Sequence, residues 1–443
     1  MPAERESKSA EKTAARTTSL WPEQAPELLP IPLPDRLLVP IGIRGAGDAS
    51  VKPAGTLIQR GDRIADHAAE SSHVPLAPES GTLGQVRPIR LTSGQTAAAV
   101  ELFVSNQPSA PSQNTLKPSE DFSSLVSGLE RIRSAGVWAD RHASPDLIGQ
   151  LNQIVARPID TLICTILDSD ASLRLNAAIA ARFGDEVVTG VSLLARTAGA
   201  RKVVLVVESS ASPEWMSPMA KAAEREKFQI IDLTNEYPQS DPTLIVYSLT
   251  RRKLRPGSLP TTRGVLVLDA AAALAVCRAA SNEPMLTVPV AVHDHANRHS
   301  HFLLAPVGIT IEHLLKHLAI PMQDAIVRGG DLLRDVTLRA DAVIAGGELT
   351  IHVTARELKM IPEPCIRCAW CIEACPTLVH PAQILDALQR RDLKMADRAG
   401  VAACIECGIC SYVCPSGLPL LHAVREIREV KLAIGSDTLA PKE

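Results

Sequence analysis

The pattern of apolar and polar positions divides the chain into segments of different kinds. Residues 35–105 carry short apolar runs at 37–39, 56–58, 63–65, 82–86 and 98–104, separated by Gly, Pro and Asp. This spacing favours a small all-β sandwich or barrel. The residues before it are rich in proline at 22–35, which disfavours both helix and sheet, so residues 1–34 are expected to form a disordered, Pro-rich arm.

From residue 122 to 283, apolar strands alternate with helical patterns. Buried strands are expected at 160–167, 202–208, 228–234 and 264–269, and helices at 174–199, 213–227 and 271–280. Fully apolar strands that alternate with helices are typical of a parallel, doubly wound sheet that is covered on both faces. The pattern therefore predicts a Rossmann-like domain.

Residues 284–356 return to mostly β patterning around one helix near 311–318, which indicates a compact α+β unit. Two further segments, 381–397 and 418–435, are expected to form helices near the C-terminus. The expected organisation is multidomain, α/β and β: arm 1–34, β domain 35–105, Ser/Pro-rich linker 106–121, Rossmann-like domain 122–283, α+β domain 284–356, cysteine-rich domain 357–435 and tail 436–443.

Composition narrows the class of protein. Of the 443 residues, 46% are hydrophobic but only 3% aromatic, so the cores must be built from Ala, Val, Leu and Ile. Lys+Arg 46 against Asp+Glu 49 gives a net charge of −3, and no basic run argues for nucleic acid. No apolar leader opens the sequence, and the longest apolar run, 264–277, is shorter than the ~20 residues of a spanning helix. We expect a cytoplasmic chain without a transmembrane segment.

The chemistry lies in two stretches with the same cysteine pattern. "CIRCAWCIEACP" occupies residues 365–376, and "CIECGICSYVCP" repeats every cysteine and the final proline 39 residues later, at 404–415. The spacing C-x2-C-x2-C-x3-C-P is that of bacterial two-cluster ferredoxins, in which the fourth cysteine ligates the other cluster. Paired structural zinc sites need no third cysteine at this spacing.

The sequence thus predicts two [4Fe-4S] clusters with crossed ligands. The first would be held by Cys365, Cys368, Cys371 and Cys414, and the second by Cys404, Cys407, Cys410 and Cys375. The remaining cysteines, Cys164 and Cys277, lie in apolar segments and are expected in the core. Four histidines in "HDHANRHSH", residues 293–301, suggest a metal site, but a polar β-hairpin loop is the preferred interpretation.

The cysteine motifs and their flanks resemble the C subunit of Rnf-type electron-transport complexes (RnfC-like). More distantly they resemble the flavin- and NADH-binding subunit of complex I and PduS-type cobalamin reductase. The resemblance extends to residues 51–86, which look like the family's barrel-sandwich hybrid domain, and to 284–318, which look like its β-grasp (SLBB-like) module. It covers residues 35–428 and implies an oxidoreductase complex with FMN and NAD(H) as further cofactors.

Three nucleotide-site signatures of the family are altered here. The loop G-x-G-G-A-G-F-P-T is replaced by "AGVWADRHASPD" at 135–146, and N-x-x-E-C-E-P by "CTILDSDASL" at 164–173. Of M-G-G-P-M-M-G, residues 327–335 keep only two glycines. If the site persists, the resemblance implies that Asp168 or Asp170 contacts the nucleotide and that Arg141 or His142 contacts the phosphate.

Two hypotheses follow. In the first, the chain is an electron-transfer subunit that relays electrons through its clusters between partner proteins and catalyses no reaction itself. In the second, it is an NAD(H)- or flavin-dependent oxidoreductase subunit with a modified pocket. The resemblance implies membrane subunits as partners and a peripheral place on the cytoplasmic face of the inner membrane.

Overall fold

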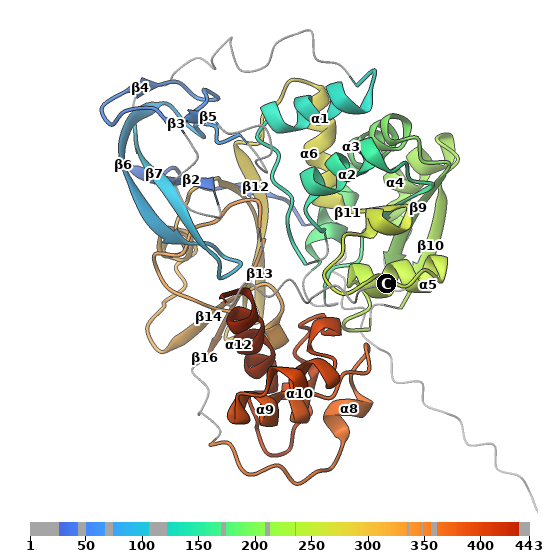
Figure 1. Cartoon of the computed structure of the whole chain (residues 1–443). Helices are drawn as coiled ribbons and strands as arrows, with labels where there is room; N and C mark the ends of the chain where they lie inside the picture. Colours follow the sequence, from blue (N-terminus) through green and yellow to red (C-terminus); the bar gives the residue numbers. More distant parts are fainter. Residues whose placement is uncertain are drawn as a thin grey trace, which may run out of the picture.

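A computed structural model gives the fold of most of the chain (Figure 1). The structure describes residues 26–42, 50–66, 74–105, 122–142, 144–169, 174–208, 213–234, 236–334, 336–347, 349–355 and 361–433. The expected linker 106–121 and tail 436–443 lie outside these residues, as does Asp170.

The N-terminal unit is all β, as its pattern predicts. One antiparallel sheet has the order β2-β7-β6-β4, and β3 pairs with β5. Leu37, Val39, Val100 and Leu102 point into the main core, whereas Leu38 and Ala99 belong to a second core, so both faces of the sheet are apolar and covered. The bounds are β2 Arg36–Gly42, β3 Ser50–Val51, β4 Leu57–Ile58, β5 Ala65–Asp66, β6 Gly81–Arg90 and β7 Thr96–Val104.

The central unit contains the expected parallel sheet, with strand order β10-β9-β8-β11. The strands are β8 Thr161–Thr165, β9 Lys202–Glu208, β10 Gln229–Leu233 and β11 Val265–Asp269. The helices are α1 Leu125–Ser134, α2 Leu147–Ala156, α3 Leu175–Ala198, α4 Pro213–Arg225, α5 Pro242–Thr250 and α6 Ala270–Ala280. All four strands and α3, α4 and α6 were predicted from periodicity, whereas α1, α2 and α5 were not.

Both faces of this sheet are covered. Leu162, Leu205 and Leu266 point into the main core, where α3 packs against α4 and α6. Their neighbours Ile163 and Val204 belong to a second core with residues of α5. From β8 the chain continues to β9 and then β10 on one side of β8, and it returns to place β11 on the other side. The direction in which strands are added therefore reverses between β8 and β11. Open α/β sheets bind ligands at such a switch point, beyond the carboxyl ends of the strands.

A six-stranded mixed sheet follows, in the order β1-β13-β12-β16-β14-β15. Its elements are β1 Leu29–Pro30, β12 Thr287–Asp294, β13 His299–Pro306, α7 Ile311–His317, β14 Ala325–Gly329, β15 Thr337–Leu338 and β16 Thr350–Ala355. The histidine-rich segment forms the turn between β12 and β13, which confirms the hairpin interpretation. The expected disordered arm 1–34 contains an ordered part, because Leu29 and Pro30 pair in parallel with β13 and Ile31 is buried.

The C-terminal unit is helical and lies beneath the rest in Figure 1. Its elements are α8 Trp370–Glu373, α9 Pro381–Arg390, α10 Leu393–Arg398, η4 Val401–Ala403, α11 Ile409–Tyr412 and α12 Leu420–Ala433. The single helix expected over 381–397 is wrong. Arg391 adopts φ 54° and ends α9, and the Asp392 carboxylate accepts a hydrogen bond from Met395 N–H to start α10.

None of the helices in the described part of the chain is long and apolar enough to cross a membrane.

Candidate metal centres and the switch-point crevice

The eight motif cysteines surround two cavities, four to each. Cys365, Cys368, Cys371 and Cys414 line one cavity, called centre 1. Cys375, Cys404, Cys407 and Cys410 line the other, called centre 2. Each centre takes three cysteines from one motif and the fourth from the other, which is the grouping that the spacing predicts. Ligation itself stays a prediction.

The backbone of the two motifs repeats as closely as the cysteines do. Three positions with positive φ in the first motif recur 39 residues later: Arg367, Ala369 and Leu378 correspond to Glu406, Gly408 and Gly417. The start of α8 likewise corresponds to that of α11, and the start of α9 to that of α12. Successive backbone N–H groups in such turns form concave nests that bind anions, including iron–sulfur clusters.

Backbone N–H groups already point at two of the sulfurs. Arg367 N–H donates to Cys365 Sγ at 3.4 Å, and Glu406 N–H donates to Cys404 Sγ at 3.3 Å. Such hydrogen bonds stabilise a thiolate and help to set the potential of a cluster. The equivalent bond recurs in both motifs, so the two centres have related surroundings.

Burial raises the pKa of three thiols of centre 2, those of Cys404, Cys407 and Cys410. Burial, with the neighbouring thiols of the same centre, raises the pKa of Cys410 to about 12. Burial likewise raises the pKa of Cys407 to about 11. Binding of iron must therefore displace protons from these groups, and the binding free energy becomes part of the folding free energy.

The donor set fits iron–sulfur clusters. Four sulfur donors around each cavity are the soft ligands that such clusters require. Within the described ranges, no three or more His, Cys, Asp or Glu side chains gather closely enough to hold a single metal ion.

The two centres differ in exposure. Cys365 is exposed, and the nearby Ile366 and Trp370 are 66% and 54% exposed, so centre 1 lies at the surface. Centre 2 is packed against the rest of the chain: Tyr237 Oη donates to Cys407 O, and Gly408 lies directly against the backbone of Leu333. Centre 2 therefore faces the body of the protein, whereas centre 1 is lined by residues of the C-terminal unit alone.

A charged cluster braces centre 2. Arg428 Nη2 donates to Cys404 O at 2.6 Å, and its Nη1 pairs with Glu406 at 2.5 Å. Arg425 Nε holds the same carboxylate at 3.0 Å. Burial raises the pKa of Glu406, but the two arginines outweigh it and the net pKa lies below the usual value. The α12 arginines thus fix the loop that carries three ligands of centre 2.

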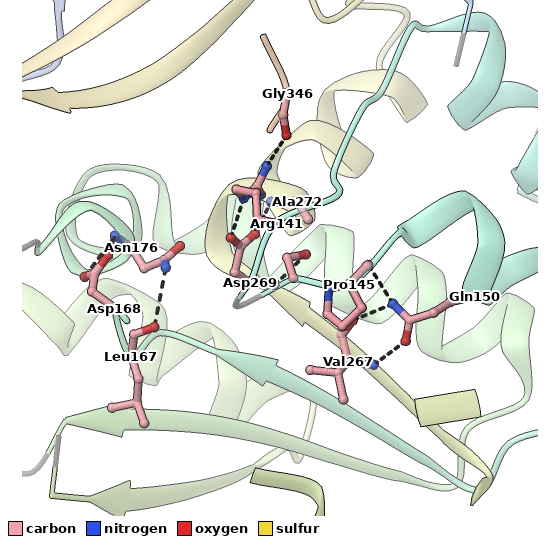
Figure 2. Close-up of polar contacts among 11 residues, drawn as sticks. Arg141, Pro145, Gln150, Leu167, Asp168, Asn176, Val267, Asp269, Ala272 and Gly346 are labelled. Atoms are coloured by element: carbon pink, nitrogen blue, oxygen red, sulfur yellow. Dashed lines mark hydrogen bonds and ion pairs between the residues drawn. The ribbon is translucent and has the colours of Figure 1, made fainter. Parts of the chain in front are cut away.

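The switch-point crevice contains a buried ion pair (Figure 2). Arg141 Nε and Nη2 donate to the two carboxylate oxygens of Asp269 at 2.9 and 2.6 Å, and Nη1 donates to Gly346 O at 2.9 Å. Asp269 ends β11 and also accepts from Ala272 N–H at the start of α6. Arg141, expected near a phosphate, thus uses three of its five N–H donors within the chain itself.

Asp168, the other expected nucleotide contact, caps a helix instead. Its carboxylate accepts from Asn176 N–H at 2.9 Å at the start of α3, as Figure 2 shows. It is 6% exposed. Asp170 lies outside the described residues. The structure therefore brings Asp168 and Arg141 to the same crevice but gives each a partner within the fold.

The residues of this crevice do not fit a flavin. Arg141 is held by Asp269 and Gly346, and Asp168 is held by Asn176, so a flavin would have to displace these contacts. A phosphate cradle needs backbone that approaches closely, as glycine allows. Here the loop presents the buried Trp138, which packs so tightly on Gly346 that no Cβ would fit there.

A second polar contact, between His142 and Asp241, lies between the crevice and centre 2. His142 Nε2 lies 3.1 Å from Asp241 Oδ2, and the Asp241 side chain accepts from Thr243 N–H at the start of α5. Burial alone would raise the pKa of Asp241, but the contacts with His142 and Thr243 lower it by more than burial raises it, so the pKa lies below the usual value. The charge of Asp241 also acts on Cys407 of centre 2.

Sequence reasoning missed Asp269, Asp241 and Tyr237. Asp269 could have been found, because a polar residue directly after an apolar strand marks the carboxyl edge of a parallel sheet. Asp241 and Tyr237 lie in a segment whose role depends on tertiary packing against the C-terminal unit, and no local pattern indicates it.

Comparisons with known proteins bear on both the cysteine centres and the crevice. A model of the Nuo51 FMN-binding domain matches residues 148–278, and a model of the 4Fe-4S dicluster domain matches residues 357–415. Among solved structures, the NAD+-reducing [NiFe]-hydrogenase in the H2-reduced state superposes with a TM-score of 0.50 at 14% identity, over 77% of this chain and 74% of that chain. This likeness concerns the fold alone.

Two curated relatives are named as the C subunit of an ion-translocating oxidoreductase complex. The one from Yersinia pestis bv. Antiqua is 25% identical over 376 residues, and the one from Vibrio cholerae serotype O1 is 23% identical over 367 residues. Each match covers 80% of this chain, but only 58% and 46% of the respective relative. The resemblance predicted from the cysteine motifs is thereby confirmed: the chain is similar to the C subunit of ion-translocating oxidoreductase complexes, and two of its segments match the Nuo51 FMN-binding domain and the 4Fe-4S dicluster domain.

Proposed function

We propose that this chain is an iron–sulfur electron-transfer subunit that relays electrons through two [4Fe-4S] clusters within an Rnf-like oxidoreductase complex. One contrast carries the proposal. Both sets of four cysteines surround their cavities, whereas the crevice in which a flavin would sit is closed by the Arg141–Asp269 pair.

In this proposal Cys365, Cys368, Cys371 and Cys414 hold cluster 1, and Cys404, Cys407, Cys410 and Cys375 hold cluster 2. Each bound cluster supplies a site for reversible one-electron transfer. The protein positions the thiolates through the repeated nests, donates N–H groups to Cys365 and Cys404, and keeps water from the buried thiols of centre 2.

The exposure of the two centres indicates which of them a partner protein would contact. Centre 2 rests on Tyr237 and Leu333 of the body, and centre 1 is flanked by the exposed Ile366 and Trp370. A partner that exchanges electrons with the chain would meet cluster 1. We infer that the partners are other subunits of a membrane complex and that the chain lies at its cytoplasmic face.

Two finer domain assignments belong to the same proposal. The β2-β7-β6-β4 sheet with the β3-β5 pair would be the barrel-sandwich hybrid domain. The six-stranded sheet with α7 would contain the β-grasp, SLBB-like module. With these assignments we propose domain boundaries at 105, 121, 283 and 356.

A second candidate is an NAD(H)- or flavin-dependent oxidoreductase subunit. The match of residues 148–278 to an FMN-binding domain favours it. In that case Asp168, Asp170 and Arg141 would contact the nucleotide, and Arg141 would first have to leave Asp269.

Purified, anaerobically prepared protein distinguishes the two. The relay predicts that acid precipitation releases no flavin and that NADH does not bleach the clusters. Released flavin with absorbance at about 450 nm, together with bleaching by NADH, would establish the oxidoreductase instead.

A further inference from the structure

The segment between β10 and α5 reaches the backbone of centre 2. Tyr237 Oη donates a hydrogen bond to Cys407 O, and Cys407 is one of the four cysteines that line this centre. The segment forms a short turn, in which Asp241 N–H donates to Pro238 O at 2.9 Å. The α/β unit therefore holds the ligand loop of centre 2 through a hydrogen-bonded turn.

Asp241 ends this turn with a buried carboxylate. It is 4% exposed, accepts a hydrogen bond from Thr243 N–H at 2.7 Å and lies 3.1 Å from His142 Nε2. These contacts keep the pKa of Asp241 below its usual value despite burial, so the carboxylate is charged at neutral pH. His142 belongs to the altered loop 135–146, in which a phosphate contact was expected. That loop thus fixes a buried negative charge beside the support of centre 2.

The charge of Asp241 acts on centre 2. The pKa of Cys407 is raised by burial and, in addition, by this charge. A charge that opposes ionisation of the thiol also opposes the arrival of an electron on a cluster that the thiol holds, because both reactions add negative charge. Glu406, a second carboxylate near centre 2, is paired with Arg425 and Arg428. Asp241 has instead a histidine, which is charged only when protonated, and a backbone N–H as partners.

The hydroxyl of Tyr237 acts in the opposite direction. It points the positive end of its O–H dipole at Cys407 O, within the loop that carries three ligands of centre 2. A positive dipole end near a cluster favours the added electron. One turn therefore presents two groups of opposite effect to the same centre.

We propose that Asp241 and Tyr237 tune the reduction potential of cluster 2, which Asp241 lowers and Tyr237 raises. This role rests on the proposed relay and adds to it the groups that set the driving force at the buried centre. Neither side chain ligates a cluster: both act on Cys407 and its loop, and His142 acts by holding Asp241 in place.

The test is a reductive titration of the cluster-loaded full chain followed by electron paramagnetic resonance, in which the signal perturbed by Cys375→Ser identifies cluster 2. Asp241→Asn removes the charge and keeps the cap of α5, since asparagine is as good an N-cap as aspartate. A unit charge about 10 Å away, at an effective dielectric constant of about 20, changes an equilibrium roughly tenfold. We therefore expect the potential of cluster 2 to rise by about 59 mV, the one-electron equivalent of a tenfold change.

Three further variants are titrated in the same way. Asp241→Glu keeps the charge and should stay near the parent potential. Tyr237→Phe keeps the ring and should lower the potential of cluster 2, a sign that general loosening of the loop does not explain. Asp185→Asn is the matched control, because it removes a carboxylate that is 67% exposed and lines neither centre; it should change neither potential.

Iron and sulfide content of the parent chain tests the relay separately. With two clusters present, an unchanged potential of cluster 2 in Asp241→Asn would overturn the tuning role and leave the relay standing. An equal shift of both clusters would overturn it as well. If Asp241→Asn loses iron, Tyr237→Phe decides: a lowered potential of cluster 2 supports the role, and an unchanged or raised one overturns it.

Discussion

Replacing Asp269 by asparagine removes the charge that neutralises Arg141 while keeping the shape of the side chain. Both side chains are buried, with 7% of Arg141 and 4% of Asp269 exposed. Asparagine still caps α6, since it is as good an N-cap as aspartate. The change therefore isolates the ion pair from the helix cap.

The expected cost follows from the burial of the pair. Removing one partner of a buried pair leaves the other charge uncompensated, at about 3–5 kcal/mol. The hydrogen bond from Arg141 to Gly346 O remains, so we expect about 3 kcal/mol. The matched control is Asp185→Asn: Asp185 pairs with Arg225, both are about two-thirds exposed, and its loss should cost at most ~1 kcal/mol.

Urea unfolding followed by circular dichroism measures both variants against the parent chain. The double variant Arg141→Met with Asp269→Asn should be more stable than the sum of the single changes predicts, because it leaves no unpaired charge. If Asp269→Asn costs no more than Asp185→Asn, the pair does not hold the crevice closed and the reasoning is refuted.

Three other outcomes are expected. Burial, with the neighbouring His293 and His295, lowers the pKa of His352 to about 3, so below pH 6.5 this histidine takes up a proton in the unfolded chain but not in the folded chain. Between pH 6.5 and 5 the free energy of unfolding should therefore fall by up to about 2 kcal/mol. The His352→Gln variant should show a shallower dependence of this free energy on pH in urea titrations. Gly408 has φ 81° and lies against Leu333 O, so Gly408→Ala should lower the melting temperature and loosen centre 2. The control Ala402→Gly, at a neighbouring half-buried position, should lower the melting temperature much less. Equal melting temperatures of the two variants would contradict the proposed packing. Cys375→Ser should perturb the electron paramagnetic resonance signal of cluster 2 and Cys414→Ser that of cluster 1; the reverse assignment would show that the ligands are not crossed.

Local patterns were sufficient to predict most elements of the α/β unit. Apolar runs such as 202–208 became strands, and α3 ended at Gly199 as its glycine indicated. The helix expected over 381–397 failed, because its break depends on Arg391 adopting a left-handed conformation and on an aspartate cap, neither of which disturbs the apolar periodicity. β1 was missed because two residues in a proline-rich segment gain their strand pairing only from β13.

In the candidate sites, too, features set by local sequence were predicted and features set by tertiary packing were not. Cysteine spacing predicted which thiols gather at each centre, since the short loops leave little freedom. The altered loop at 135–146 indicated a changed crevice, but not that Arg141 would bind Asp269, which is 128 residues away in sequence. Which side chain meets which across such a separation depends on packing that local sequence does not encode.

The measurement that tests the central claim most directly is a reductive titration of the anaerobically purified chain, followed by absorbance and electron paramagnetic resonance. The account predicts about eight iron and eight sulfide per chain, two clusters that dithionite reduces and NADH does not, and no flavin after acid precipitation. Reduction of the clusters by NADH with release of bound flavin would contradict it.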